Sequence, residues 1–298
     1  MTTVRVAVPR KGRPLEAVLE RLAARTGTTD LADDVVSTLQ YEKAITKDKQ
    51  DADRDVYDRL AAYSDTDDPT APEYTLLRDD RAGMPRRIVF DSLTLELDGC
   101  DLQLVGREEP FRALRTHEFA LGFDSADLVL EEVVGLDPEP LTGLDEVNAR
   151  IDPHDTDVRI VSGLGDTVWH TLLATPETRR RLDADLDRSF VDAYEGKLCI
   201  SPRYERLVEA VLGTDTIEGV EFTYPDEGAV EEAAIAETGI GVYLTVTGST
   251  AREYGLELGE RLFPSETVLL ENTAETTAAT ERAADLFVGA DLETKVAP

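Results

Sequence analysis

The sequence predicts an α/β fold in which mainly parallel sheets are flanked by helices. Short β-rich runs alternate with helical patterns almost from end to end, which is typical of this class. The length of 298 residues, at roughly 150 residues per domain, favours two domains with large cores. Cys100 and Cys199 lie in short apolar contexts without a C-x-x-C spacing, so we expect both to be reduced core residues.

The chain opens with a predicted strand and helix. Val4–Val8 is a run of β-branched and small apolar residues, which favours a strand. Pro14 suits the first position of a helix, and Leu15, Val18 and Leu22 recur on one helical face. From about residue 27 to residue 83 the chain is acidic and weakly periodic. We interpret this stretch as an elaboration on the fold.

Within this elaboration the sequence predicts one helix and one loop, at Val56–Tyr63 and Ser64–Glu73. Beyond it the predicted elements are strands at Ile88–Leu97 and Asp101–Val105 joined by a turn at Asp98-Gly99, a helix at Phe111–Thr116, a strand at Phe119–Phe123, and a helix at Ala126–Val134 capped by Asp124 or Ser125. Residues 135–157 contain three prolines and predict an irregular linker.

A second series of strands and helices fills the rest of the chain. In order, the predicted elements are a strand at Val158–Val161, a turn at Ser162–Asp166, helices at Thr167–Ala174 and Thr178–Asp187, a strand at Lys197–Ile200, a helix beginning at Pro202, a strand at Val220–Tyr224, a helix at Gly228–Ala236, a strand at Ile240–Val246, a short helix ending at Tyr254, strands at Leu262 and Val268–Leu270, and a helix at Ala274–Val288. The helix after Pro202 has the clearest apolar stripe.

The charge balance excludes some classes of partner. Thirty-one basic and 62 acidic residues give a formal net charge of −31, which disfavours binding to nucleic acid or to an anionic membrane. Only six of the basic residues are Lys, whereas 32 of the acids are Asp, a balance suited to hydrating a surface in concentrated salt. We therefore expect a halophilic, cytoplasmic protein. No apolar stretch approaches the roughly 20 residues that span a bilayer.

The strongest local motif is Thr247-Gly248-Ser249-Thr250, between a predicted strand and a predicted helix. Amides at a helix start, three hydroxyls and the positive end of the helix dipole can bind an anion, and Gly lets a phosphate approach closely. The alternative is that Ser249 or Thr250 simply caps the helix.

A second candidate site is the basic loop that contains Arg10, Lys11, Gly12 and Arg13 after the first strand. Basic residues are scarce in this chain, and Arg and Lys both bind phosphate oxygens. The alternative is that these cations pair with neighbouring acids. Arg107 and Arg86-Arg87 are weaker candidates of the same kind.

Other features predict no chemistry. Ser162-Gly-Leu-Gly165 has only part of a dinucleotide-binding pattern, and we interpret it as a turn. His117, His154 and His170 lack metal-ligand spacing and are interpreted as surface or core residues. The chain has no G-x-S-x-G, H-E-x-x-H or P-loop motif, which excludes the enzymes that depend on them.

In their order along the chain, six segments resemble the catalytic part of the ATP phosphoribosyltransferases that open histidine biosynthesis. The segments are Val4–Arg13 with its Lys-Gly-Arg loop, Arg107–Pro110, Phe119–Asp127 with the acids Glu131-Glu132, Ser201–Tyr204, Gly228–Glu231, and Thr247–Thr250 with Tyr254–Leu256. The last segment is similar to the family's phosphoribosyl motif Thr-Gly-x-Thr-Leu and is the most specific of the six. Residues 26–85 and 164–195 have no clear counterpart.

The resemblance implies a two-lobed fold of the type 2 periplasmic-binding kind with substrates in the cleft. One lobe would comprise residues 1–125 and 252–298, and the other residues 126–251. The implied reaction transfers the phosphoribosyl group of PRPP to a nucleotide or base acceptor with Mg²⁺ as cofactor. Thr247, Gly248, Ser249 and Thr250 would bind the 5-phosphate. The residues implied to bind pyrophosphate or nucleotide are Lys11, Gly12, Arg13 and Arg107, and a homo-oligomer is possible.

The chain also departs from the family's pattern. The family has acids that hold the ribose hydroxyls where this chain has Gly239 and Tyr243, and an Asp where it has Ala120. We therefore expect a divergent paralogue. The alternatives to an active transferase are a non-catalytic protein that binds or senses PRPP or a nucleotide, and an interaction subunit of a true transferase.

Overall fold

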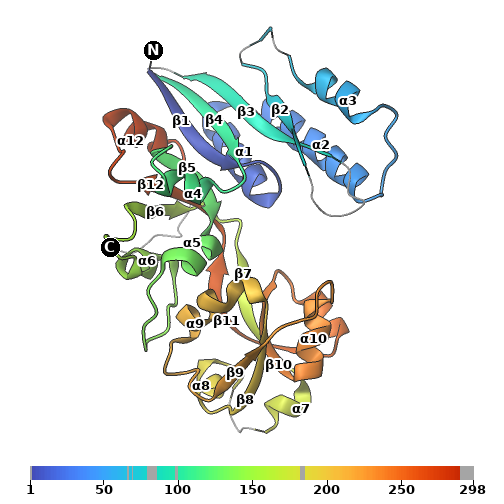
Figure 1. Ribbon diagram of the computed structural model, residues 1–298, viewed down its shortest axis with the longest axis vertical. Coiled ribbons are helices and arrows are strands. Elements are labelled where there is room, and N and C mark those ends of the chain that lie inside the picture. The colour runs from blue at the N-terminus through green and yellow to red at the C-terminus, as the bar shows by residue number, and fades with distance from the viewer. Residues whose placement is uncertain are drawn as a thin grey trace. The chain divides into compact units, whose positions relative to one another are not determined.

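A computed structural model describes residues 2–65, 67–68, 70–78, 86–97, 100–181 and 185–288. The described residues form two compact units, and each contains one sheet with helices. Unit 1 comprises residues 2–124, 157–166 and 267–288, and unit 2 comprises residues 125–156 and 167–266. The predicted α/β class is confirmed (Figure 1).

Unit 1 is built on a seven-stranded sheet with the order β2-β3-β4-β1-β5-β12-β6. The strands are β1 (Thr2–Pro9), β2 (Glu73–Leu77), β3 (Arg87–Leu97), β4 (Cys100–Arg107), β5 (Leu121–Ser125), β6 (Val158–Gly163) and β12 (Thr267–Asn272). The central strand β1 pairs in parallel with β4 and β5. The pairs β2–β3, β3–β4 and β6–β12 are antiparallel.

We had expected mainly parallel sheets, but the sheet of unit 1 is mixed. The hairpin of β3 and β4 was predicted, and Leu97 pairs with Cys100, although its expected turn at Asp98-Gly99 lies outside the described residues. The β3–β4 hairpin adds an antiparallel partner because two strands that are neighbours in sequence can pair with only a short turn between them. Strand β12 adds another by returning to pair with the distant β6.

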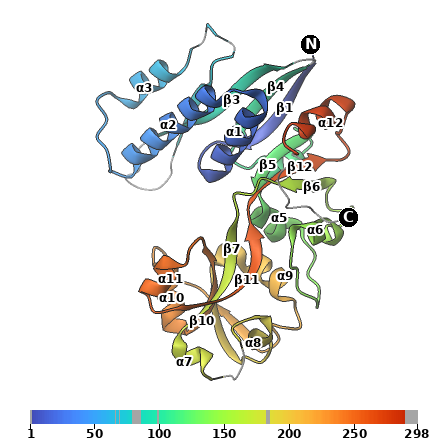
Figure 2. The same cartoon turned by 180° about the vertical axis from the view of Figure 1, so that it is seen from behind.

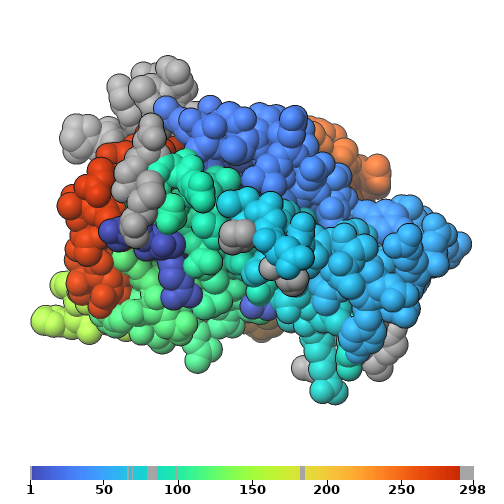
Figure 3. Space-filling view, turned by 90° about the horizontal axis from the view of Figure 1, so that it is seen from above, coloured from blue at the N-terminus to red at the C-terminus, as the bar shows by residue number. Residues whose placement is uncertain are grey.

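The helices of unit 1 are α1 (Arg13–Thr26), α2 (Thr29–Thr46), α3 (Val56–Tyr63), α4 (Pro110–Arg115) and α12 (Ala278–Asp285). Side chains of α1, α2 and α12 share one apolar cluster with the sheet, and Leu15, Val18 and Leu22 on α1 are buried in it as predicted. Figure 2 shows α1 and α2 alongside β1 and β3 from behind. In Figure 3 the lighter blue atoms of α2 and α3 are open to view on the surface.

The elaboration at residues 27–83 contains more regular structure than the sequence predicts. Helix α3 matches its predicted bounds, but α2 and β2 were not predicted, and β2 begins at Glu73 where a loop was expected to end. The buried side of α2 ends in two polar residues, Glu42 and Thr46. Glu42 is buried because Arg59 of α3 binds both of its carboxylate oxygens, at 2.7 and 2.9 Å.

Unit 2 is built on a five-stranded sheet with the order β11-β7-β10-β8-β9. The strands are β7 (Val168–Ala174), β8 (Gly196–Ile200), β9 (Val220–Thr223), β10 (Ile240–Thr245) and β11 (Glu257–Ser265). The helices are α5 (Ala126–Val133), α6 (Leu144–Val147), η1 (Asn148–Arg150), α7 (Pro176–Arg179), α8 (Arg188–Asp192), η2 (Pro202–Tyr204), α9 (Glu205–Leu212), α10 (Glu231–Thr238) and α11 (Ser249–Glu253). Strands β8, β9 and β10 run parallel, whereas β7 is antiparallel to both β10 and β11.

Two helix predictions in this unit are wrong. Thr167–Ala174 forms strand β7, and the region of the predicted helix Thr178–Asp187 holds the end of the short helix α7, with residues 182–184 outside the described part of the chain. Strand β7 lies between two other strands and is buried on both faces from His170 to Ala174, so its apolar residues do not alternate.

The boundaries of the units differ from those of the predicted lobes at two segments. Residues 157–166 lie in unit 1 because β6 pairs with β12, and residues 252–266 lie in unit 2 because β11 pairs with β7. The predicted change of lobe after residue 125 differs by one residue from the observed change after Asp124. Cys100 and Cys199 are buried free thiols, as predicted. Within the described residues no helix is long and apolar enough to cross a membrane.

Candidate functional site

The predicted phosphate loop connects strand β10 to helix α11 in unit 2. Gly248 is the N-cap of α11 and has a left-handed backbone, with φ at 69°. A Cβ atom at this position would lie 2.2 Å from Cδ2 of Leu258, so glycine suits both the conformation and the space. Thr247, Ser249 and Thr250 are exposed.

The hydroxyls of this loop do not cap the helix in the way the alternative supposed. The N-cap residue is Gly248, which has no side chain, and the amide of Ser249 makes only a long contact of 3.4 Å to Oγ1 of Thr247. The first intrahelical bond runs from the amide of Arg252 to the carbonyl of Gly248, at 3.2 Å. The amides of the first turn therefore have no acceptor within the helix and point toward its open end.

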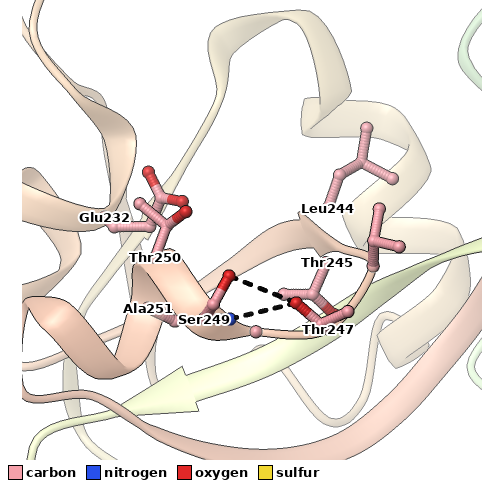
Figure 4. A pocket seen from close by; sticks show the side chains of 9 residues that line it. Glu232, Leu244, Thr245, Thr247, Ser249, Thr250 and Ala251 are labelled. Carbon is pink, nitrogen blue, oxygen red and sulfur yellow. Dashed lines mark hydrogen bonds between the residues drawn. The ribbon is translucent and has the colours of Figure 1, made fainter.

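The loop lines a pocket of about 290 Å³. Its walls come from the end of β10, the loop, the start of α11 and one residue of α10, namely Leu244, Thr245, Val246, Thr247, Gly248, Ser249, Thr250, Ala251 and Glu232 (Figure 4). Figure 4 shows the Thr247 hydroxyl bonded to Ser249, at 3.2 Å between the two oxygens. Val246 is 71% exposed and, with Leu244 and Ala251, gives the pocket an apolar part beside its polar groups.

Glu232 was not predicted as a site residue. It belongs to a different helix, and among 62 acidic residues no spacing in the sequence distinguishes it. Only the packing of α10 beside β10 brings its carboxylate to the loop.

The structure also shows what stands at the two positions where the resemblance implies acids. Gly239 ends α10 with φ at 102°, and a Cβ atom there would lie 2.5 Å from Oγ1 of Thr178. The Tyr243 hydroxyl forms a hydrogen bond with Glu231. Burial and then the charges of Glu231 and Glu232 raise the pKa of Tyr243 to about 12, so its phenol stays protonated.

The basic loop lies in unit 1, at the carboxyl ends of two parallel strands. Pro9 at the end of β1 is in register with Arg107 at the end of β4, which places Arg107 beside the loop that begins at Arg10. Gly12 has φ at 81° and is the N-cap of α1. In sheets of this type, ligands bind beyond the carboxyl ends of parallel strands.

Each cation of the loop has an acidic neighbour, as the alternative supposed. Arg10 lies 3.6 Å from Asp91, and Lys11 lies 3.7 Å from Glu108. Arg13 lies 3.6 Å from Asp166 and also donates to its carbonyl oxygen. These are long contacts between partly exposed side chains, and such pairs contribute at most about 1 kcal/mol.

Arg107 is positioned by an aromatic ring. Its guanidinium carbon lies 4.9 Å from the centre of the Phe119 ring, and that of Arg5 lies 4.8 Å from the same ring. Nη1 of Arg107 also donates to the carbonyl of Gly106, at 3.2 Å. A cation–π contact of this kind fixes a guanidinium without neutralising its charge. Of the weaker candidates, Arg86 lies over the Tyr57 ring.

The histidines have the roles expected of surface and core residues. His117 and His154 are exposed, whereas His170 is buried with Nε2 at 3.0 Å from Oδ1 of Asp127. The other oxygen of Asp127 accepts the hydroxyl of Ser265 at 2.8 Å. Asp127, one of the residues that carried the family resemblance, is therefore part of a buried polar cluster rather than of the pocket.

Of the turn predicted at Ser162–Asp166, Ser162 and Gly163 are the last residues of strand β6, and only residues 164–166 lie between β6 and β7, still within unit 1. Its Asp166 accepts the amide and the hydroxyl of Thr267, at 2.7 and 2.8 Å. Asp166 therefore has a structural role, whereas the predicted turn is confirmed only after Gly163, which pairs with Val268 in the sheet.

Comparison with known proteins adds a family and several structural likenesses. The ATP phosphoribosyl transferase (HisG:HisZ) complex from Thermotoga maritima has a chain 14% identical to this one, with a TM-score of 0.42 over 95% of this chain and 94% of that chain. The OxyR2 regulatory domain from Vibrio vulnificus is 11% identical, with a TM-score of 0.35 over 64% of this chain and 80% of that chain. No curated protein matches the sequence significantly.

The family match covers the chain from end to end. The model described as halobacterial ATP phosphoribosyltransferase matches residues 1–298. That description agrees with the acidic, lysine-poor composition and with the Thr247–Thr250 motif. Because the match spans every residue, the chain belongs to the halobacterial ATP phosphoribosyltransferase family.

Proposed function

We propose that this chain binds PRPP and transfers its phosphoribosyl group to a nucleotide or base, with release of pyrophosphate. The observation that carries the proposal is the pocket in unit 2, which is lined in part by the Thr247–Thr250 loop, with its hydroxyls and with first-turn amides that have no acceptor within the helix. Such groups bind a phosphate monoester through short hydrogen bonds. Membership of the phosphoribosyltransferase family supports the same ligand.

In this proposal the basic loop of unit 1 binds the pyrophosphate or nucleotide. Lys11 and Arg13 have weak ion pairs that a phosphate group can displace, and Arg107 keeps its charge over Phe119. The positive charges would stabilise the negative charge that develops on the leaving pyrophosphate, which is the electrostatic contribution that preorganised cations make to catalysis. Gly12 supplies the positive φ, 81°, with which the chain enters α1.

Mg²⁺ fits this site only as a companion of the substrate. The described residues contain no group of three His, Cys, Asp or Glu side chains that could hold a metal ion. Magnesium in phosphate sites is commonly held by substrate oxygens and one or two carboxylates, so PRPP itself would supply most of the ligands. Mg²⁺ would neutralise part of the negative charge of PRPP, and Glu232 is the carboxylate among the residues that line the pocket.

The proposal is tested by measuring pyrophosphate release from PRPP in molar KCl with Mg²⁺, with ATP, AMP and free bases as acceptors. Thr250→Ala removes one hydroxyl of the loop and should reduce the PRPP-dependent rise in melting temperature together with turnover. Turnover with any acceptor supports the transferase. A rise in melting temperature without turnover supports a binding or sensor protein instead, and no response to PRPP contradicts both.

A further inference from the structure

The pocket beside Thr247–Thr250 has two ends of opposite chemical character. The loop presents hydrogen-bond donors, since the amides of the first helical turn have no intrahelical acceptor and the Thr250 hydroxyl lines the pocket. Helix α10 contributes Glu232, whose ionised carboxylate can only accept hydrogen bonds (Figure 4). A ligand that fills the pocket must therefore offer acceptors to the loop and donors to Glu232.

Glu232 differs from its neighbour Glu231 in its hydrogen bonding. The Glu231 carboxylate is bonded by the Tyr243 hydroxyl. Across the parts of the chain that the structure describes, the Glu232 carboxylate has no hydrogen bond and no ion pair, although its charge contributes to the raised pKa of Tyr243. The pocket thus contains an acceptor that the protein itself leaves unsatisfied.

The charge of Glu232 also limits what can bind beside it. A second phosphate placed against this carboxylate would be repelled, because like charges within a few ångströms oppose each other strongly at a partly buried site. Hydroxyl groups, in contrast, can donate to it. The volume of about 290 Å³ is at the lower end of the range for ligand pockets, which suits one small phosphate ester better than a whole nucleotide.

We infer that Glu232 is the residue by which this pocket recognises the hydroxyl groups of a sugar phosphate, so that the pocket selects a phosphorylated sugar over a phosphate ester without hydroxyls. The inference rests on the proposed function, because it takes Thr247–Thr250 as the phosphate site. Glu232 would then be a binding residue on α10 that replaces the two acids implied by the family resemblance. At those positions this chain has Gly239, which has no side chain, and Tyr243, whose hydroxyl is bonded to Glu231.

The test compares two phosphate monoesters, ribose 5-phosphate and methyl phosphate, which share the anionic group and differ in hydroxyls. Dissociation constants are measured by calorimetry on the full chain in molar KCl with EDTA, so that no metal bridges ligand and carboxylate. We expect ribose 5-phosphate to bind at least about tenfold more tightly, as a charge-assisted hydrogen bond permits. Glu232→Ala should abolish the preference and leave the affinity for methyl phosphate unchanged or higher.

The matched control is Glu237→Ala, which removes the same side chain from an exposed position on the same helix and should keep the preference. If Glu232→Ala does not fold, Glu232→Gln preserves the side chain's size and should lower the preference several-fold, since a neutral amide oxygen is a weaker acceptor.

Each outcome decides the inference. A preference that survives in the Glu232 variants, or equal binding of both esters by the wild type, overturns it and leaves the phosphate loop standing. Failure of the wild type to bind either ester overturns the phosphate loop and the role of Glu232 together.

Discussion

Glu131 and Arg206 each cap the helix that carries the other. Glu131 lies on α5, and its Oε2 accepts the amide of Leu207 at the start of α9, at 3.0 Å. Arg206 lies on α9, and its Nη2 and Nε donate to the carbonyl of Val134 at the end of α5, at 2.7 and 3.1 Å. The two side chains thereby satisfy opposite ends of two packed helices and oppose the two helix dipoles with the favourable charges.

This arrangement predicts a pH dependence of stability. Burial raises the pKa of Glu131 despite its hydrogen bonds to Leu207 and Arg206. The folded chain then holds this proton more tightly than the unfolded chain does, so Glu131 contributes a loss of stability as pH rises from about 4.5 through its raised pKa. Glu131→Gln lacks this loss, and its stability relative to the wild type should increase over that interval.

The measurement is urea unfolding at a series of pH values in molar KCl. Glu218→Gln, at an exposed position, is the control and should run parallel to the wild type. A difference between Glu131→Gln and the wild type that is constant with pH contradicts the prediction.

A second prediction concerns the ion pair of Glu42 and Arg59. Arg59→Met leaves the Glu42 carboxylate buried with only the Tyr63 hydroxyl, at 3.0 Å, and should lower the free energy of unfolding by about 3–5 kcal/mol. Replacing both partners, Glu42→Leu with Arg59→Met, should recover most of this loss because no charge then remains buried. Unfolding midpoints in urea measure both effects, and a double variant as unstable as the single one would falsify the explanation.

The glycine of the phosphate loop should be sensitive to substitution in a way that a neighbouring glycine is not. Gly248→Ala and Gly255→Ala both place a Cβ on a left-handed residue, with φ at 69° and 73°. Each should cost about 1 kcal/mol of stability from the backbone. Only Gly248→Ala also meets Leu258 and alters the pocket, so only this variant should lose the rise in melting temperature produced by inorganic phosphate. Equal losses in both variants would count against a phosphate site at the loop.

Lys11 should contribute to PRPP binding, and its acidic partner should oppose it. Lys11→Met removes a cation from the basic loop, and we expect KM for PRPP to rise at least about fivefold, as loss of one charge-assisted contact predicts. Lys49→Met, at an exposed position of the same unit, is the control. Glu108→Gln releases Lys11 from its ion pair and should leave KM unchanged or lower. An unchanged KM in Lys11→Met removes this residue from the proposed site.

The net charge of −31 predicts that salt stabilises the protein. The screening length falls from about 10 Å at 0.1 M to about 3 Å at 1 M, which weakens the repulsion between acidic groups in the folded state. The melting temperature should therefore rise steadily with KCl over this range. An uncharged osmolyte at equal osmolality should produce a smaller rise, and an equal one would argue against charge screening as the cause.

Most elements of the fold were predictable because their apolar residues follow the periodicity of helix or strand. The stripe on α9 and the run at β1 are of this kind, and both lie where expected. Helix α2 was missed because its buried side continues through Glu42, which the sequence presents as one more acid. Its burial depends on Arg59, 17 residues away. Strand β7 was mistaken for a helix because burial on both faces removes the alternation that identifies a strand.

The residues of the candidate site also fall into those that the sequence reveals and those that only the packing reveals. Thr247–Thr250 is contiguous, so its strand, glycine and hydroxyls could be recognised together in the sequence. The pairing of Lys11 with Glu108 was foreseen as an alternative, although the partner itself was not named. Glu232 could not be found, because its place at the pocket is created by the packing of α10 against β10 and by no local pattern.

The path of the chain has a consequence for how this family can change. Over residues 2–288 the backbone passes from one unit to the other after Asp124, Thr156, Asp166 and Glu266, so the described part of unit 1 is assembled from three separate stretches of sequence and that of unit 2 from two. A single recombination event cannot exchange either unit as a cassette, and a fragment ending at any one of these junctions leaves a sheet without some of its strands. Exchange of either whole unit would therefore require crossovers at several junctions at once.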